Sequence, residues 1–174
     1  QNMQLSWPPL FEPRLLACGE MQDLGTTLIA LTSHGFGAVA SIDPTAAGVA
    51  VPAEPFSIVS PVSEEPLVGS SWTSSGVKLI TRAGDVLRCP EGPLDGVWTC
   101  ELDTSLSLPV ESGTKIVAAA MSDSMVAFAL NNSVSSMRGT KVELFHELDA
   151  TNGWQPLAEV HLPAHHDGSI RRVA

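Results

Sequence analysis

Basic residues are scarce in this sequence, and their scarcity disfavours one class of partner. Nine lysines and arginines stand against nineteen aspartates and glutamates, which gives a formal net charge of −10 at pH 7. A protein that binds a nucleic-acid backbone neutralises phosphates with clustered cations. The sequence therefore predicts no nucleic-acid partner, and the acidic excess is interpreted as a solvated surface that favours solubility.

Long apolar runs are also missing. None approaches the roughly 18 uninterrupted apolar residues that a membrane-spanning helix needs, so no membrane span is expected. Hydrophobic residues nevertheless make up 44% of the 174 residues, which argues against general disorder. Gln1 is not preceded by a basic, apolar leader, so we expect either a removed targeting segment or an internal piece of a longer chain. The sequence assigns no compartment.

Motifs that carry catalysis or bind metal are missing as well. There is no Cys-x-x-Cys pair for a zinc ribbon and no Gly-x-Ser-x-Gly around a nucleophilic serine. Glu64-Glu65-Pro66 is interpreted as a solvated loop rather than a glycosidase carboxylate pair. The segment His161–Asp167 contains three histidines and an aspartate, but neighbours along a strand point to opposite faces, which favours a polar loop. We therefore predict no catalytic residue, no metal ligand set and no cofactor.

The three cysteines do not suggest a secreted disulfide framework, because their number is odd. Cys89 ends one expected strand and Cys100 lies in the next, with a ten-residue loop between them. A disulfide is geometrically possible if the hairpin places them opposite each other. Two small, mostly buried thiols are the favoured interpretation, and the sequence leaves the choice open.

Thirteen prolines and fourteen glycines are spread along the chain, which is typical of many short elements joined by turns. Residues 1–14 carry three prolines and are expected to form an extended lead-in. From Leu15 onward, short apolar runs alternate with turn residues, and no long amphipathic helix is evident. The sequence thus predicts an all-β chain. Its expected strands are Leu15–Cys18, Thr26–Leu31, Phe36–Ile42, Phe56–Val59, Leu67–Trp72, Val77–Thr81, Val86–Cys89, Val97–Leu102, Lys115–Met121, Met125–Leu130, Val142–Leu148 and Trp154–Leu162.

The expected strands repeat with a period of about fifty residues. Apolar runs that follow a loop begin at Leu15, Leu67, Lys115 and Ile170, and each interval holds about four short strands. This rhythm is typical of β-propeller blades, so residues 15–174 are predicted to form about three four-stranded blades. The expected blades occupy approximately residues 15–62, 67–108 and 115–163, with the start of a further blade at 168–174. A β-sandwich of about a dozen strands is the alternative, but it does not explain the spacing.

Two corners and the C-terminal stretch give this rhythm a more specific resemblance. Asp149–Pro163 resembles the corner between the third and fourth strands of a kelch repeat, where an acidic turn precedes a tryptophan that packs between blades. Leu94–Trp98 resembles the same corner one blade earlier, although the kelch glycine pair after the second strand is absent. Ala164–Ala174 resembles the His- and Gly-containing start of a WD-repeat blade, without the Trp-Asp pair. The resemblance implies a propeller-like fold and leaves the subfamily open.

Trp72, Trp98 and Trp154 lie in or beside expected strands. Exposed together, they could form a face that binds a ligand or a partner. The favoured interpretation is that they are structural anchors between blades, because large aromatic side chains dominate cores of this kind.

Three blades do not close a propeller, which typically has four to eight. The remaining blades are expected from chain outside this sequence or from a partner subunit. By analogy with other propellers, we expect a non-catalytic scaffold for protein–protein interaction, because a rigid ring presents loops and a blade edge can accept a partner strand. A carbohydrate-binding or carbohydrate-cleaving propeller and a structural subunit of a large assembly are the alternatives.

Overall fold

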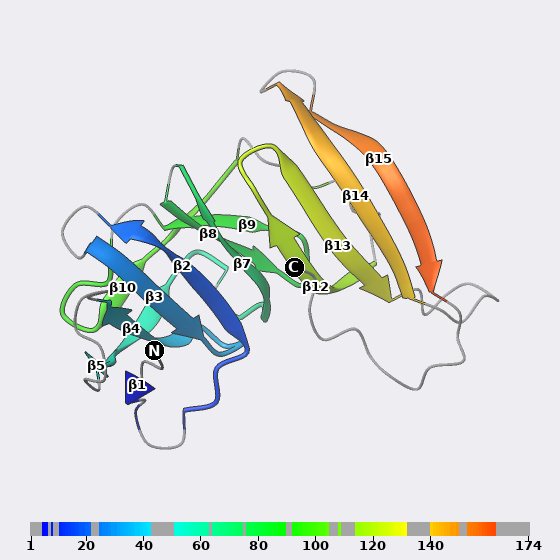
Figure 1. Ribbon diagram of the computed structural model, residues 1–174. Helices are drawn as coiled ribbons and strands as arrows, with labels where there is room; N and C mark the ends of the chain where they lie inside the picture. Colours follow the sequence, from blue (N-terminus) through cyan, green and yellow to red (C-terminus); the bar gives the residue numbers. More distant parts are fainter. Residues whose placement is uncertain are drawn as a thin grey trace.

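The computed structural model describes residues 5–6, 8, 11–21, 25–42, 51–62, 64–74, 76–89, 92–104, 108, 114–131, 140–149 and 153–162. Within these residues all regular structure is β-strand and no helix is present (Figure 1). The predicted all-β class is therefore confirmed. Hydrogen bonds join the described strands into sheets of eight, five and two strands.

The described strands form three successive antiparallel meanders of four strands each, which we call the first, second and third meander. The first contains β2 (Leu15–Met21), β3 (Gly25–Leu31), β4 (Phe36–Ser41) and β6 (Glu54–Val59). The second contains β7 (Leu67–Thr73), β8 (Gly76–Thr81), β9 (Val86–Cys89) and β11 (Glu101–Leu102). The third contains β12 (Lys115–Met121), β13 (Met125–Asn131), β14 (Thr140–Asp149) and β15 (Gly153–Leu162).

Three short strands complete the described structure. Strand β1 (Leu5–Ser6) lies in the expected lead-in and runs parallel to β5 (Val51–Pro52). Strand β10 (Val97–Thr99) runs parallel to β6 at the edge of the first meander. The predicted start of a further blade at 168–174 lies outside the described residues.

One predicted strand is corrected by the structure. Val97–Leu102 is not continuous, because it divides at Cys100 into β10, which pairs with β6, and β11, which pairs with β9. The backbone N–H of Cys100 donates to the carbonyl oxygen of Val59 at 2.9 Å, so the chain stays on the first meander up to this residue. It then crosses to the second meander.

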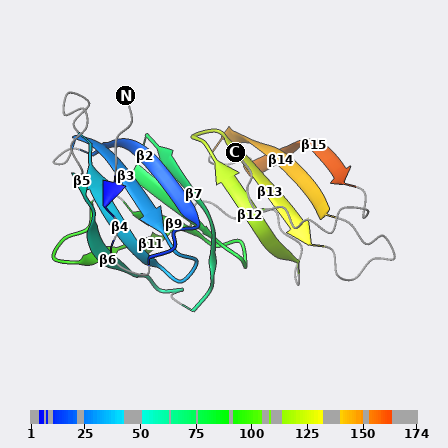
Figure 2. The same ribbon diagram turned by 60° about the horizontal axis from the view of Figure 1, so that its bottom comes forward.

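The second meander is covered on both faces by its neighbours. Figures 1 and 2 show the first and third meanders on opposite sides of it. Val77 and Leu79 of β8 point into a core shared with the first meander, whereas Ile80 points into a core shared with the third. Because successive side chains of a strand point to opposite faces, this strand buries apolar side chains on both sides, although Lys78 lies on the same side as Ile80 and pairs with Asp103.

Glycines let the first strands of successive meanders approach each other closely. A Cβ atom added to Gly19 of β2 would lie 2.3 Å from the ring of Trp72 on β7. One added to Gly69 of β7 would lie 2.6 Å from the carbonyl oxygen of Ala119 on β12, and β7 and β12 run parallel at this point. The meanders therefore contact one another along their first strands, with a small residue on one side.

Cys89 and Cys100 form a disulfide in the structure, with their Cα atoms 4.4 Å apart and both side chains buried. Arg88 of β9 lies opposite Glu101 of β11, which places the two cysteines opposite each other as well. Two free thiols, the interpretation favoured on sequence alone, are not the state seen here. The disulfide links the two ends of the segment in which the chain crosses from the first to the second meander. The third cysteine, Cys18, is an exposed free thiol.

Replacing both Cys89 and Cys100 with alanine is expected to lower the free energy of unfolding by about 3 kcal/mol, because the bond closes a loop with a sequence separation of 11. Urea denaturation of the double variant and the parent gives the difference. A Cys18→Ala variant is the control and should match the parent. A double variant as stable as the parent would show that the bond does not hold the crossing.

Candidate functional site

The third meander has one covered face and one open face. Ile116, Phe128 and Phe145 point toward the second meander and are buried in the shared core, where the rings of Phe128 and Phe145 stack with centroids 5.1 Å apart. On each strand, the side chains that alternate with these buried ones point to the other face of the sheet. We call this second face the open face. Its partly or fully exposed members are Ala120 of β12, Met125 and Ala127 of β13, Val142 and Leu144 of β14, and Ala158 and Val160 of β15, whereas Ala118 and Ala129 on the same face are 3% and 0% exposed.

The strand register aligns the open face into continuous apolar rows. Ala127 lies opposite Ala120 on one side and Leu144 on the other, and Leu144 in turn lies opposite Ala158. Val160, at the edge of the sheet, is 51% exposed. Four strands about 4.8 Å apart, with about six residues each at about 3.3 Å, span a face of about 400 Å² in extent, of which only part is exposed apolar surface because Ala118 and Ala129 are buried.

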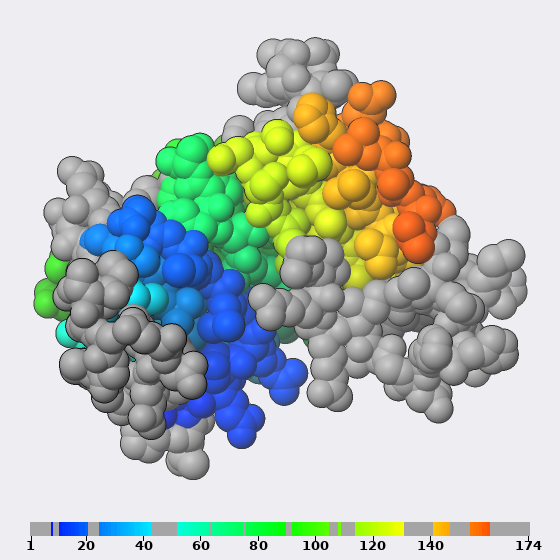
Figure 3. All heavy atoms as spheres, in the orientation of Figure 1, coloured from blue at the N-terminus to red at the C-terminus, as the bar shows by residue number. Residues whose placement is uncertain are grey.

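Polar residues lie at the margin of the open face. His146 and Gln155 occupy its end near the β14–β15 corner, and Lys115 at the start of β12 is exposed at its rim. Among the described strand positions of this face, Lys115 is the charged residue. Figure 3 shows the third meander, from yellow-green to orange, forming one end of the described surface.

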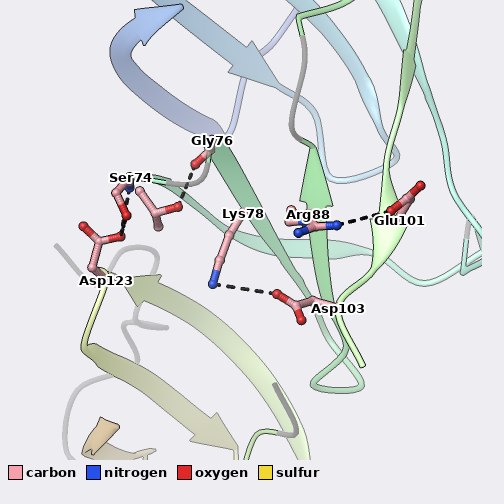
Figure 4. Close-up of polar contacts among 8 residues, drawn as sticks. Ser74, Gly76, Lys78, Arg88, Glu101, Asp103 and Asp123 are labelled. Carbon is pink, nitrogen blue, oxygen red and sulfur yellow. Dashed lines mark hydrogen bonds and ion pairs between the residues drawn. The ribbon is translucent and has the colours of Figure 1, made fainter. Parts of the chain in front are cut away.

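Hydrogen bonds hold the third meander on the second. Asp123, in the turn before β13, accepts hydrogen bonds from the backbone N–H and hydroxyl of Ser74 at 2.8 and 2.9 Å (Figure 4). These hydrogen bonds hold the pKa of the Asp123 carboxyl below its ordinary value. At a buried position, the N–H of Met121 donates to the hydroxyl of Ser71 at 2.8 Å. These hydrogen bonds therefore fix the third meander, which includes the open face, against the second meander.

A shallow cavity of about 250 Å³ lies on the covered side of β14 and β15. It is lined by Glu143, Phe145, Pro156, Leu157, Ala158 and Glu159. Lys141 pairs with both Glu143 and Glu159, the latter at 2.7 Å between Nζ and Oε2. Lys141 donates hydrogen bonds to Glu143, which has the larger effect, and to Glu159. Both raise the pKa of the lysine, so it stays charged. The carboxylates are thus engaged within the protein.

The three predicted tryptophan anchors do not gather on one face. Trp98 is buried, with its ring edge-on to Phe56 at a centroid distance of 5.4 Å. Trp72 packs against the core between the first and second meanders, and Trp154 packs against the core between the second and third. The exposed aromatic face that the sequence left open is therefore not formed by these residues.

The other candidates from the sequence lie apart from one another. Glu64 and Glu65 are exposed in the loop before β7. The side chains of His161–Asp167 lie outside the described residues. Within the described part of the chain, no group of three or more His, Cys, Asp or Glu side chains is placed to hold a metal ion. The same residues contain no helix that is long and apolar enough to span a membrane.

Sequence reasoning did not single out the open face, although one signal was present. The alternation in Val142–Leu148 predicts a half-buried strand without saying which of its sides is buried. In the structure Phe145 is buried, Glu143 lies on the covered side, and Val142 and Leu144 are partly exposed. Strand β14 therefore has apolar side chains on both faces, and those on the open face are only partly buried in the described structure.

Comparison with known proteins adds no relative, because no family model, no curated protein and no solved structure matches the chain. The resemblance to kelch and WD repeats stays a prediction from the sequence.

Replacing Trp98 with alanine is expected to lower the free energy of unfolding by about 3 to 5 kcal/mol, because a fully buried aromatic side chain leaves a cavity. Chemical denaturation measures this loss, and a Leu94→Ala variant, at a side chain that is 74% exposed, is the control and should change little. A sugar-binding role for Trp98 predicts the reverse, namely loss of binding on a glycan array with stability unchanged.

Proposed function

We propose that the chain is a segment of a β-propeller. Three observations support this proposal: the four-stranded antiparallel meanders follow one another in the chain, their first strands lie side by side, and a core lies between each successive pair. A β-sandwich has two sheets around one core, whereas the three meanders here enclose two. In a propeller each blade packs face to face on the next, as the second meander does on both sides.

On this fold, we propose that the protein is a non-catalytic scaffold for protein–protein interaction. The observation that carries the proposal is the open face of the third meander, which is apolar in its interior and polar at its margin. Fully burying an exposed Val or Leu side chain contributes about 1.5 to 3 kcal/mol, and Val142 and Leu144, which are already partly buried, contribute less. A face with several such side chains is an association surface, to be covered by another sheet.

A carbohydrate site has less support. The nearest arrangement of carboxylates and an aromatic ring is the cavity between Glu143, Glu159 and Phe145. Both carboxylates bind Lys141, and Phe145 is 8% exposed with its ring stacked on Phe128. A sugar ring would have neither a free carboxylate pair nor an aromatic platform there.

A Leu144→Glu variant tests the scaffold function in extracts of the cells that make the protein. The parent chain is expected to elute in assemblies larger than a dimer of the 18.3 kDa chain. We expect Leu144→Glu to reduce the share in these assemblies at least about tenfold, because a buried unpaired carboxylate costs several kcal/mol. Size-exclusion chromatography with immunodetection measures the distribution.

Leu102→Glu is the matched control, since Leu102 is 38% exposed on β11, away from the open face. It should elute like the parent. Equal elution of all three proteins, or elution of the parent as a free chain, would contradict the scaffold proposal.

A further inference from the structure

The disulfide between Cys89 and Cys100 follows from the strand register around it. Their Cα atoms lie 4.4 Å apart, and residues of an antiparallel pair that exchange no backbone hydrogen bonds lie about 4.5 Å apart. Cys100 is in such a pair, because its N–H donates to the carbonyl oxygen of Val59 on another strand. The distance is within the range that a disulfide spans without movement of the backbone.

The bond also indicates the kind of compartment in which the chain folds. Cys89 and Cys100 are 0% and 2% exposed, in the core between the first and second meanders. Their thiols form the bond by giving two electrons and two protons to the disulfide of an oxidoreductase. Cytosolic reductants oppose this reaction, and structural disulfides are found in the endoplasmic reticulum, the bacterial periplasm and the extracellular space. A buried disulfide therefore places folding in an oxidising compartment.

One sequence motif depends on a compartment of this kind. Asn131-Asn132-Ser133 is the single Asn-x-Ser/Thr triplet in the chain whose middle residue is not proline. Such a triplet is the acceptor for N-linked oligosaccharides in proteins that enter the secretory pathway. The disulfide involves other residues, so it is independent evidence for that environment.

The triplet begins where strand β13 ends. Asn131 is the last residue of β13 and pairs with Thr140 of β14 and Lys115 of β12, and Lys115 is exposed. Asp123, which holds the third meander on the second, lies just before the other end of this strand. With about 3.3 Å per residue, the two ends of the strand are about 20 Å apart. An oligosaccharide on Asn131 is thus at the rim of the sheet, away from these hydrogen bonds.

We propose that the chain enters the secretory pathway and carries an N-linked oligosaccharide on Asn131. The amide nitrogen of this residue forms a bond to the anomeric carbon of an oligosaccharide donated from a lipid diphosphate. The bond between that carbon and the phosphate oxygen breaks, the lipid diphosphate leaves, and the amide nitrogen gives up one proton. Ser133 completes the triplet that the transferase recognises. This inference does not rest on the proposed scaffold function.

Peptide mass spectrometry of the protein from the cells that make it tests the modification. The peptide that contains Asn131 is expected to carry an oligosaccharide. Digestion with peptide-N-glycosidase should lower the intact mass in one step, because the chain has a single triplet, and should convert Asn131 to aspartate. Undigested protein in which Asn131 is unmodified throughout would overturn the proposal.

Variants of the triplet show whether the oligosaccharide is on this residue. Asn131→Gln and Ser133→Ala each destroy the triplet and should abolish the mass shift completely. Asn132→Gln is the matched control, because the same substitution one residue later keeps the triplet, and it should be glycosylated like the parent. A mass shift that persists in Asn131→Gln would place the oligosaccharide elsewhere and contradict the assignment.

The compartment has a readout of its own. Alkylation of the unfolded protein, carried out as the cells are lysed, is expected to modify Cys89 and Cys100 only after reduction. Free thiols at both positions would contradict an oxidising compartment and overturn the proposal as a whole. A disulfide in a chain without the oligosaccharide would overturn the modification of Asn131.

Discussion

Burial of the second meander on both faces is the interaction on which the rest of the structure depends. Val77 and Leu79 on one side of β8 and Ile80 on the other join the first and third meanders to it. Neither neighbour has a second core of this kind within the described residues. A strand with large apolar side chains on both faces buries them only with a sheet on each side, so the stack follows from the side chains of its central member.

The same requirement explains why the ends of the stack are of functional interest. The third meander is apolar on both faces, as the second is, yet in the described structure its open face keeps exposed apolar side chains at Met125, Ala158 and Val160. The hydrophobic effect is proportional to the area removed from water, so the open face has a driving force for association that a polar sheet face would lack. The proposed function therefore rests on a sheet face that is not packed in a core as the faces between the meanders are, and not on a catalytic or ligand-binding site.

Much of the local structure could be predicted from the sequence. Val86–Cys89 and Lys115–Met121 have the bounds expected from their apolar content and flanking turn residues. What could not be predicted depends on contacts between distant segments. The division of Val97–Leu102 at Cys100 follows from pairing with two different meanders, and the burial of Phe145 instead of Leu144 depends on which side the second meander covers. A short sequence window contains neither piece of information.

Thiol accessibility of the open face is the most direct measurement of whether this surface is covered. A Val142→Cys substitution in a Cys18→Ser background, labelled with a water-soluble maleimide in the native assembly, reports the exposure of the face. We expect labelling at least about tenfold slower than at a Leu102→Cys reference in the same background, and equal rates once the assembly is dissociated in mild denaturant. Labelling of Val142→Cys as fast as the reference in the native assembly would show that no partner covers the face and would contradict the proposed association.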